Sequence, residues 1–126
     1  MALAYVDTSC LVAIAFDEPG AASLRRRLRR FDELFAANLL EAELRAALRR
    51  EGAAGEPALL RVLTWIVPDR PLGPEIARVL AAGYVRGADC WHLATALYLA
   101  EDPGALSFLT LDARQGTVAS ALGFAL

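Results

Sequence analysis

The fold is decided by the stretch Leu3-Ala4-Tyr5-Val6-Asp7-Thr8-Ser9 near the N-terminus. Its apolar residues predict a short buried strand over 3–6, and that strand ends at a carboxylate followed by two hydroxyls. In open parallel α/β sheets, ligands and chemistry gather beyond the carboxyl ends of the strands. A half-buried Asp at this place loses hydration and needs a cation to compensate it. We therefore expect Asp7 to face a divalent metal ion, together with acids from later in the chain.

The composition indicates one folded domain without a membrane segment. The chain has 126 residues, of which 56% are apolar and 22% charged, and we expect a single domain over 1–126. Its mean hydropathy of +0.38 is high, yet no apolar run approaches the roughly 18 residues that a membrane-spanning helix needs. No basic leader precedes Asp7, and Cys10 and Cys90 are too few for a disulfide scaffold. We expect a cytoplasmic protein whose cysteines pack as small apolar side chains.

Predicted strands alternate with predicted helices along the chain. Strands are expected over 3–6, 34–37, 65–67 and 105–110, with 123–126 as a candidate edge strand. Helices are expected over 10–16, 20–31, 39–50, 56–64, 74–82, 89–100 and 113–122, with Ser9 and Asn38 as N-caps. This alternation predicts an α/β fold with helices on both faces of a parallel sheet.

Glu43 is the one acid on the predicted apolar face of the helix over 39–50. At about 100° per residue, that face holds Leu39, Ala42, Glu43, Ala46, Ala47 and Arg50. Glu43 is either paired with Arg50 or functional. No cation stands three or four residues away from it, where helical ion pairs form. This spacing favours the functional interpretation.

Two further acids, Asp89 and Asp112, stand at predicted helix starts. An Asp there commonly caps the helix and interacts favourably with the helix dipole. A cap uses one carboxylate oxygen and leaves others free, so a capping Asp can also bind a ligand. Asp112 follows a predicted strand as well, and the hydroxyl of Thr110 can hold a water or a second carboxylate in place. Both roles stay open for each acid.

The four acids Asp7, Glu43, Asp89 and Asp112 are predicted to meet at the active-site end of the parallel sheet. Carboxylates at one point repel one another unless cations neutralise them. Oxygen-only ligation suits Mg²⁺ or Mn²⁺, which retain waters and bind substrate phosphates. We therefore interpret the four acids as metal ligands and catalytic residues for phosphodiester hydrolysis, in which the metal activates a water.

Four segments resemble the motifs of the PIN-domain ribonucleases. They are Asp7-Thr8-Ser9, Glu43-Leu44-Arg45-Ala46-Ala47-Leu48, Asp89-x-x-His92-Leu93-Ala94-Thr95-Ala96, and Thr110-Leu111-Asp112 with Leu122-Gly123. Within that family the chain is most similar to the VapC-type toxins of bacterial and archaeal toxin–antitoxin pairs. The similarity extends over essentially the whole chain, and the order and spacing of the four acids are specific in combination.

The resemblance implies a three-layer α/β/α fold with a parallel sheet of about five strands. It also implies a Mg²⁺- or Mn²⁺-dependent endoribonuclease that forms homodimers and is inhibited by a small VapB-type antitoxin. The family's metal-binding acids match Asp7, Glu43, Asp89 and Asp112, and its supporting hydroxyls match Ser9 and Thr110. We interpret His92 as structural, in packing or capping. Some members carry a further acid that residues 113–126 lack, so the number of metals, one or two, stays open.

The absence of Lys and of a Gly-rich turn excludes several rival functions. All 13 are Arg, and the chain has no Lys. A response-regulator receiver needs a Lys near its phosphoacceptor, and a P-loop needs a Gly-x-x-x-x-Gly-Lys motif. No Gly-rich turn follows the first predicted strand, which excludes a Rossmann dinucleotide-binding module. The remaining alternatives are a PIN-domain nuclease that serves RNA processing without an antitoxin, and a PIN-like module that binds without cutting.

Arginines supply candidate contacts to RNA phosphates, although the sequence does not identify the RNA. Arg86, Arg45 and Arg49 are closest in sequence to the proposed catalytic elements, and Arg86 is the first to test. A second group lies in the helix predicted over 20–31: Arg25, Arg26, Arg27, Arg29 and Arg30. This group either clamps an RNA backbone or forms a solvated face, and the solvated face is favoured for those that point away from the site.

Overall fold

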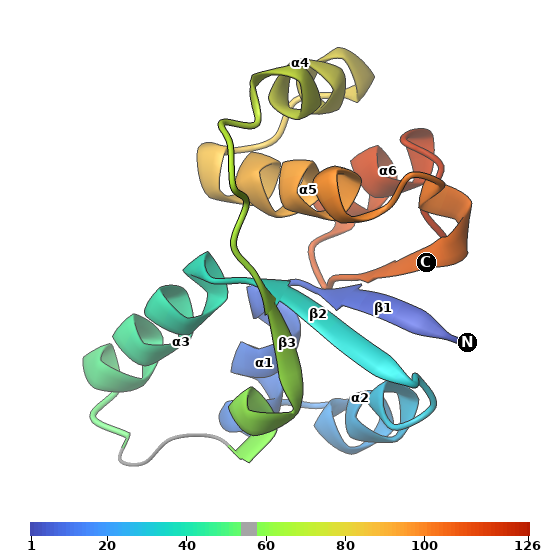
Figure 1. The fold of residues 1–126 in the computed structure, drawn as a ribbon. Coiled ribbons are helices and arrows are strands. Elements are labelled where there is room, and N and C mark those ends of the chain that lie inside the picture. Colours follow the sequence, from blue (N-terminus) through green and yellow to red (C-terminus); the bar gives the residue numbers. More distant parts are fainter. Residues whose placement is uncertain (54–57) are drawn as a thin grey trace.

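A parallel sheet lies between two layers of helices (Figure 1). The computed structural model describes residues 1–53 and 58–126. The strands are β1 (Leu3–Val6), β2 (Glu33–Ala37), β3 (Leu63–Ile66) and β4 (Leu106–Leu109), in the spatial order β3-β2-β1-β4. Every neighbouring pair is parallel, with Tyr5 opposite Phe35 on one side and opposite Phe108 on the other. The predicted α/β fold with a parallel sheet is confirmed.

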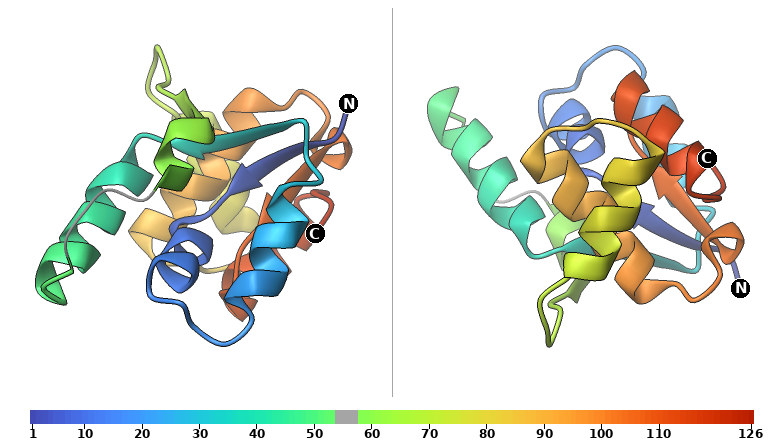
Figure 2. Two further views of the ribbon diagram at one scale, coloured as in Figure 1. Left: turned by 90° about the horizontal axis from the view of Figure 1, so that it is seen from below. Right: turned by 90° about the horizontal axis from the view of Figure 1, so that it is seen from above.

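Helices cover both faces of the sheet, as Figures 1 and 2 show from three directions. The layer below the sheet in Figure 1 consists of α1 (Thr8–Ala15), α2 (Ala21–Leu28) and α3 (Leu39–Arg50). The opposite layer consists of α4 (Gly73–Ala82), α5 (Gly87–Leu99) and α6 (Ala113–Ala121). Two 3₁₀ turns, η1 (Ala58–Val62) and η2 (Pro103–Ala105), precede β3 and β4. Crossover segments of this kind are needed because parallel strands cannot be joined by tight turns.

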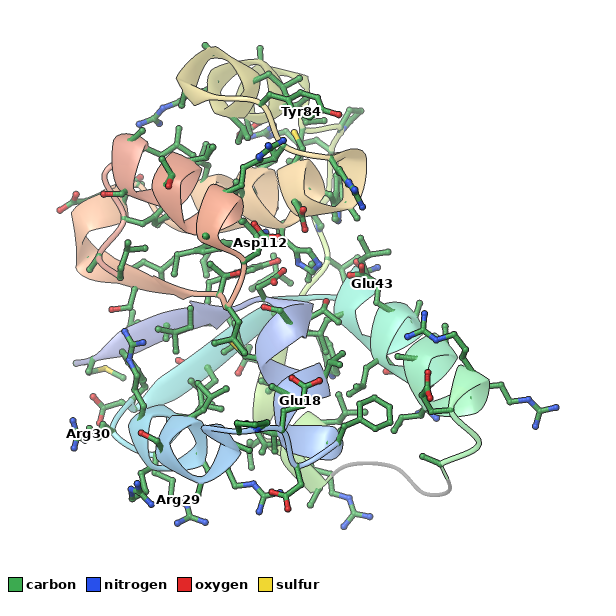
Figure 3. The ribbon with its side chains drawn as sticks, turned by 180° about the vertical axis from the view of Figure 1, so that it is seen from behind. Glu18, Arg29, Arg30, Glu43, Tyr84 and Asp112 are labelled. Atoms are coloured by element: carbon green, nitrogen blue, oxygen red, sulfur yellow. The ribbon has the colours of Figure 1, made fainter. Side chains whose placement is uncertain are left out.

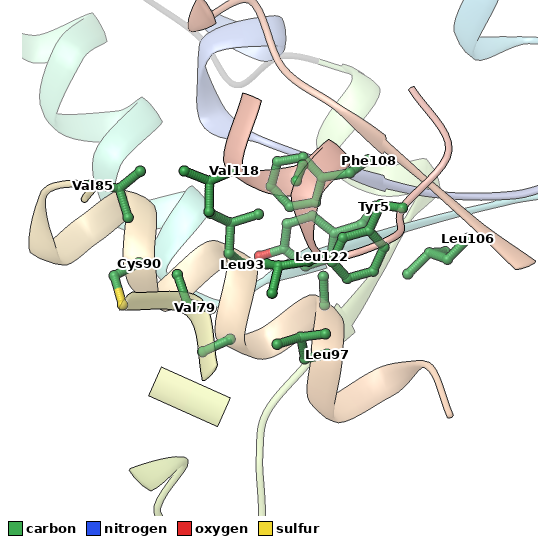
Figure 4. Close-up of a cluster of buried hydrophobic side chains, with 14 of the residues drawn as sticks. Tyr5, Val79, Val85, Cys90, Leu93, Leu97, Leu106, Phe108, Val118 and Leu122 are labelled. Atoms are coloured by element: carbon green, nitrogen blue, oxygen red, sulfur yellow. The ribbon is translucent and has the colours of Figure 1, made fainter. Parts of the chain in front are cut away.

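The strands are apolar along their length because both of their faces are buried. Successive side chains of a strand point to opposite faces. Tyr5 therefore joins the core beneath α5 and α6, whereas Ala4 and Val6 join the core against α1 and α3. Figure 4 shows the first of these cores, where the ring of Tyr5 stacks on that of Phe108 with 5.2 Å between centroids. The high mean hydropathy thus reflects two internal cores.

Both cysteines are buried free thiols, one in each core, as predicted. Burial raises the pKa of the Cys10 thiol to about 12, and that thiol donates to the carbonyl oxygen of Leu109 at 3.4 Å. A protonated, enclosed thiol is a poor nucleophile, so Cys10 serves packing. Among residues 1–53 and 58–126, the helices are too short or too polar to span a bilayer.

The C-terminal segment contributes one bridge in place of the predicted edge strand over 123–126. Ser107 and Ala125 form a single parallel bridge beside β4, so the described sheet has four strands where about five were expected. At the end of α6, Gly123 adopts a φ of 100°, which other residues rarely adopt. Phe124, which follows it, is buried with its ring centroid 5.8 Å from that of Phe108. Burial of this ring takes the place of a full ladder.

Two other expectations change in detail around α3 and β3. Asn38 precedes α3 as predicted, but its backbone is helical and its side chain makes no capping hydrogen bond. The helix predicted over 56–64 is the 3₁₀ turn η1, and residues 56 and 57 lie outside the described part of the chain. β3 begins at Leu63, two residues earlier than predicted, because Leu63 is buried in the core against α3.

The buried face of α3 is not the one that the sequence pattern predicted. Leu40, Leu44 and Leu48 point into the core, whereas Ala42 and Ala46 are exposed. Glu43 lies on the flank of this leucine ridge and is half-buried. The physical reason is area, because each Leu removes much more apolar surface from water than an Ala does. A stripe defined mainly by alanines was therefore a weak guide to the orientation of the helix.

This orientation predicts how α3 responds to substitution. Leu44→Ala should lower the free energy of unfolding by about 2–5 kcal/mol, because it leaves a cavity in the core. Ala46→Ser on the exposed face should change it by less than about 0.5 kcal/mol. Urea unfolding followed by circular dichroism measures both. Equal losses for the two variants would contradict the observed orientation of the helix.

Candidate functional site

The four predicted acids come from four different elements at one end of the sheet. Asp7 follows β1, Asp112 follows β4, Glu43 lies in the second turn of α3, and Asp89 lies in the first turn of α5. Figure 3 shows Glu43 and Asp112 at the junction between the sheet and the helices around it. The ionisation of Asp89 responds to the charges of all three other acids, so the four groups act electrostatically as one cluster.

Asp7 is buried and held by three donors. Its Oδ2 accepts from the backbone N–H of Ser9 and from the hydroxyl of Thr110, both at 3.2 Å, and its Oδ1 accepts from Nε2 of Gln115 at 3.4 Å. Asp7 is therefore the N-cap of α1, and the prediction that Ser9 caps this helix was wrong. The helix begins two residues earlier than predicted because the carboxylate of Asp7 reaches the orphan N–H two residues ahead. With only 4% of its surface exposed, Asp7 has a fixed position.

Ser9 and Thr110 support the end of β4, which lies beside Asp7. Ser9 Oγ accepts from the backbone N–H of Leu111 at 3.0 Å and lies 3.4 Å from Thr110 Oγ1. Thr110 Oγ1 in turn accepts from the backbone N–H of Asp112 at 3.1 Å. These hydroxyls tie the loop that carries Asp112 to the start of α1. Their contacts agree with the supporting role that the resemblance implied.

Asp112 caps α6, which is one of the two roles that the sequence left open, with Oδ1 accepting from the backbone N–H of Gln115 at 2.8 Å. Its side chain is otherwise exposed, so its second oxygen is free to bind a ligand. The cap and the ligand role that the sequence left open are therefore compatible at this residue.

Gln115 is a site residue that the sequence interpretation missed. It is completely buried, its Oε1 lies 2.8 Å from the hydroxyl of Thr110, and its Nε2 donates to Asp7 and to the backbone carbonyl of Asp89. It thus links the ends of β1 and β4 to the start of α5. The spacing Asp112-x-x-Gln115 has the form of a capping box, which was a usable signal for its presence at the helix start.

A second hydrogen-bonded chain fixes Glu43. Its Oε1 accepts from the hydroxyl of Thr8 at 2.8 Å and lies 2.7 Å from Nε2 of His92. The other ring nitrogen of His92, Nδ1, lies 2.8 Å from the hydroxyl of Tyr5, which accepts from the backbone N–H of Ala37. Tyr5 therefore donates to Nδ1, and Nε2–H donates to the carboxylate. His92 orients a proposed ligand, beyond the packing role that the sequence predicted.

The alternative pairing of Glu43 with Arg50 is wrong. Arg50 instead pairs with Glu51 at 3.2 Å on the exposed side of α3. Burial raises the pKa of Glu43, but the hydrogen bonds from His92 and Thr8 outweigh burial and hold that pKa below its ordinary value. Burial likewise raises the pKa of Tyr5 well above its usual range, so the phenol remains a donor.

The surroundings of Asp89 raise its pKa, whereas those of Glu43 lower the pKa of that residue. α5 begins at Gly87, so Asp89 lies within its first turn and Arg86 takes the N-cap position that the sequence offered to Asp89. Burial, followed by the negative charges of Asp7 and Asp112, raises the pKa of Asp89 above its ordinary value. Neighbouring carboxylates thus disfavour the ionised form of Asp89, which is the situation that a bound cation reverses.

The donor set fits a hard divalent cation that keeps part of its water shell. In residues 1–53 and 58–126, no group of three His, Cys, Asp or Glu side chains is close enough to enclose a metal ion directly. The acids of the cluster nevertheless offer only oxygen atoms. The hydrogen bonds that orient Glu43 both reach Oε1 and leave Oε2 free, and Oδ1 of Asp7 accepts one hydrogen bond, from Gln115, and keeps a lone pair. Mg²⁺ and Mn²⁺ use few carboxylates and several waters, so this arrangement suits them.

The arginines lie at different distances from the cluster. Arg86 is exposed at the start of α5, and Arg49 is exposed near the end of α3. Arg45 forms an ion pair with Glu41 at 2.8 Å on the exposed side of α3. The arginines of 25–30 are exposed on and just after α2, and Figure 3 shows Arg29 and Arg30 far from Glu43 and Asp112. Their placement favours the solvated-face interpretation.

One cavity among the described residues lies away from the acids. It has a volume of about 960 Å³ and is lined by α1, α2, β2 and η1 residues such as Ile14, Leu28 and Leu34. A smaller groove of about 560 Å³ begins at Thr110 and Asp112 and follows α6. We locate the chemistry at the acids, because none of the four lines the cavity, whereas the groove begins at Asp112.

The opposite environments of two acids give a prediction about stability. In EDTA at pH 7, Glu43→Gln should lower the melting temperature, since the hydrogen-bonded carboxylate stabilises the fold above its unfolded pKa and loses that effect as pH falls through its folded pKa. Asp89→Asn should raise it, because the ionised Asp89 is repelled in the folded state. Glu18→Gln, at an exposed distant acid, should leave it unchanged. Shifts of the same sign at residues 43 and 89 would contradict this account.

The chain is similar to known proteins over nearly its whole length. The family model described as PIN domain matches residues 4–120, a span that contains all four acids. The chain is also 36% identical over 129 residues to Ribonuclease VapC46 of Mycobacterium tuberculosis (strain ATCC 25618 / H37Rv), with 99% of this chain and 96% of the relative covered. The chain therefore belongs to the PIN-domain family, and within it to the VapC proteins.

Proposed function

We propose that this chain is a Mg²⁺- or Mn²⁺-dependent endoribonuclease that acts as the toxin of a toxin–antitoxin pair. The observation that carries the proposal is the cluster of Asp7, Glu43, Asp89 and Asp112, four acids from distant parts of the chain at one end of a parallel sheet. The similarity to a relative named Ribonuclease VapC46 supports RNA as the substrate and the VapC role.

The four acids are the proposed metal ligands. Their oxygens are hard donors, and Asp7 and Glu43 are held in place by bonds from Ser9, Thr110, Gln115, Thr8 and His92. When bound, the metal supplies a water of lowered pKa and stabilises negative charge on the phosphate and the leaving oxygen. The protein's own part is to keep the carboxylates ionised and oriented against their mutual repulsion. His92 does this for Glu43 by donating from Nε2.

The proposed partners follow from the same assignment. They are an RNA substrate, a VapB-type antitoxin and a second copy of the chain in a homodimer, in the cytoplasm. Arg86, Arg45 and Arg49 remain proposed contacts to RNA phosphates, and Arg86 is the strongest of the three because it begins the helix that carries Asp89. Phosphate contacts of this kind add affinity without sequence preference.

Asp7→Asn should reduce RNA cleavage by more than about 100-fold, since metal-site substitutions commonly have effects of this order or larger. The fold should be retained, because Asn is as good an N-cap as Asp for α1. Cleavage of a labelled structured RNA in Mg²⁺ or Mn²⁺ measures the rate, and Glu18→Gln is the matched control. An Asp7→Asn variant that cuts as fast as the parent would refute the assignment.

Metal should also stabilise the folded protein, because an ion that binds only the native state shifts the unfolding equilibrium toward it. We expect millimolar Mn²⁺ to raise the melting temperature of the parent, with a smaller rise for Asp89→Asn. A dye-free scan by circular dichroism measures this, and Ca²⁺ and K⁺ at matched ionic strength serve as controls. An equal rise for the parent and Asp89→Asn would argue against a site at these acids.

A further inference from the structure

Tyr84 is an exposed aromatic residue in the loop that precedes the helix of Asp89. Among the described residues it is the one aromatic side chain in the set of large exposed apolar groups, with 68% of its surface accessible. It lies in the loop between α4 and α5, directly before the segment that leads to Asp89. An aromatic ring left in water at this place contributes little to the core.

The loop that carries Tyr84 is held rigidly against α6. Val85 is buried with 3% of its surface exposed, and it belongs to the core beneath α5 and α6. On the other side, Gly83 lies so close to α6 that a Cβ there would stand 2.9 Å from Cγ2 of Val118. Because both neighbours of Tyr84 are held in place, the backbone at Tyr84 is fixed relative to α6, which Asp112 caps.

Arg114 covers one face of the Tyr84 ring. Its guanidinium carbon lies 5.9 Å from the ring centroid, within the range of a cation–π contact. Arg114 lies two residues after Asp112, and Figure 3 shows Tyr84 and Asp112 on the same side of the molecule. In the described part of the chain neither Arg114 nor Arg86 forms an ion pair with the nearby acids. Both cations therefore remain available to an anionic ligand.

The combination of an open ring face and free guanidinium groups matches a single-stranded nucleic acid. Each nucleotide of an unpaired strand offers a base that can stack on an aromatic ring and a phosphate that an Arg can bind. An acidic protein segment would satisfy the arginines but would leave the ring face without a matching group. Arg114 contacts the ring and lies two residues after Asp112, so a strand bound at the acids can extend toward the ring within a few nucleotides.

We propose that Tyr84, backed by Arg114, is a stacking platform for an unpaired base of the RNA substrate, next to the phosphate that is cut. This inference rests on the proposed nuclease function and goes beyond it, because it requires the RNA to be single-stranded beside the cut. The ring binds the base, and Arg114 stabilises the ring from its other face and faces the backbone.

The test compares binding with and without bases. The probes are fluorescein-labelled oligoadenylate of about 12 nucleotides and an abasic ribose-phosphate strand of the same length and charge. Affinity is measured by anisotropy in Mg²⁺ in an Asp7→Asn background, so that cleavage does not interfere. Tyr84→Leu removes the ring and keeps an apolar side chain, Tyr84→Phe keeps the ring, and Val62→Ser is a control at a residue that is 62% exposed beside β3.

Tyr84→Leu should weaken binding of oligoadenylate by about fivefold or more, as loss of one stacked base does, while binding of the abasic strand stays unchanged. Tyr84→Phe and Val62→Ser should bind both strands like the parent. Unchanged binding of oligoadenylate by Tyr84→Leu would overturn the proposed platform and would indicate that the ring contacts a protein partner instead. An equal loss of affinity for both strands would overturn it as well. A parent that never cuts RNA would refute the nuclease proposal without altering these binding ratios, so the two failures are distinguishable.

Discussion

Electrostatic repulsion among four carboxylates is the constraint on which the arrangement of this site depends. Asp7, Glu43 and Asp112 lie close enough to Asp89 for their charges to affect its ionisation, and the pKa of Asp89 is raised by burial and by all three of these neighbours. Asp7 and Glu43 are held by hydrogen-bond donors that offset part of this repulsion. The donors are a backbone N–H, a hydroxyl and an amide for Asp7, and a hydroxyl and an imidazole for Glu43. A divalent cation would relieve the rest.

The donors themselves are tied into the sheet. Tyr5 lies at the centre of one core, stacked on Phe108, while its hydroxyl bridges the backbone of β2 and His92. Gln115 is completely buried and joins the ends of two strands to α5. Packing of the core and orientation of the acids are therefore coupled, since a shift of β1 would move Asp7 and the partner of His92 together. Rigid supports of this kind are what a preorganised catalytic site requires.

Much of the fold and the convergence of the four acids at one end of the sheet could be predicted, and the errors have physical causes. The continuous apolar strands and the alternation with helices indicated a parallel sheet, and each acid was recognisable as a carboxylate at a strand end or helix start. The predicted orientation of α3 was wrong because burying an alanine removes little apolar surface from water compared with the ridge of Leu40, Leu44 and Leu48. Gln115 and Thr8 were missed because a polar residue near a helix start is ordinary until tertiary contacts bury it.

The sequence determined the chemical inventory: oxygen donors without a Lys, one His, and apolar strands long enough to be covered on both faces. These properties depend on residue type and local spacing, which a linear chain already contains. Only the tertiary structure decided which donors meet which acids, that His92 faces Glu43 while Arg50 turns away, and that the exposed ring of Tyr84 meets Arg114. Such pairings join residues up to about a hundred positions apart, and they follow from strand order and packing, which no local pattern encodes.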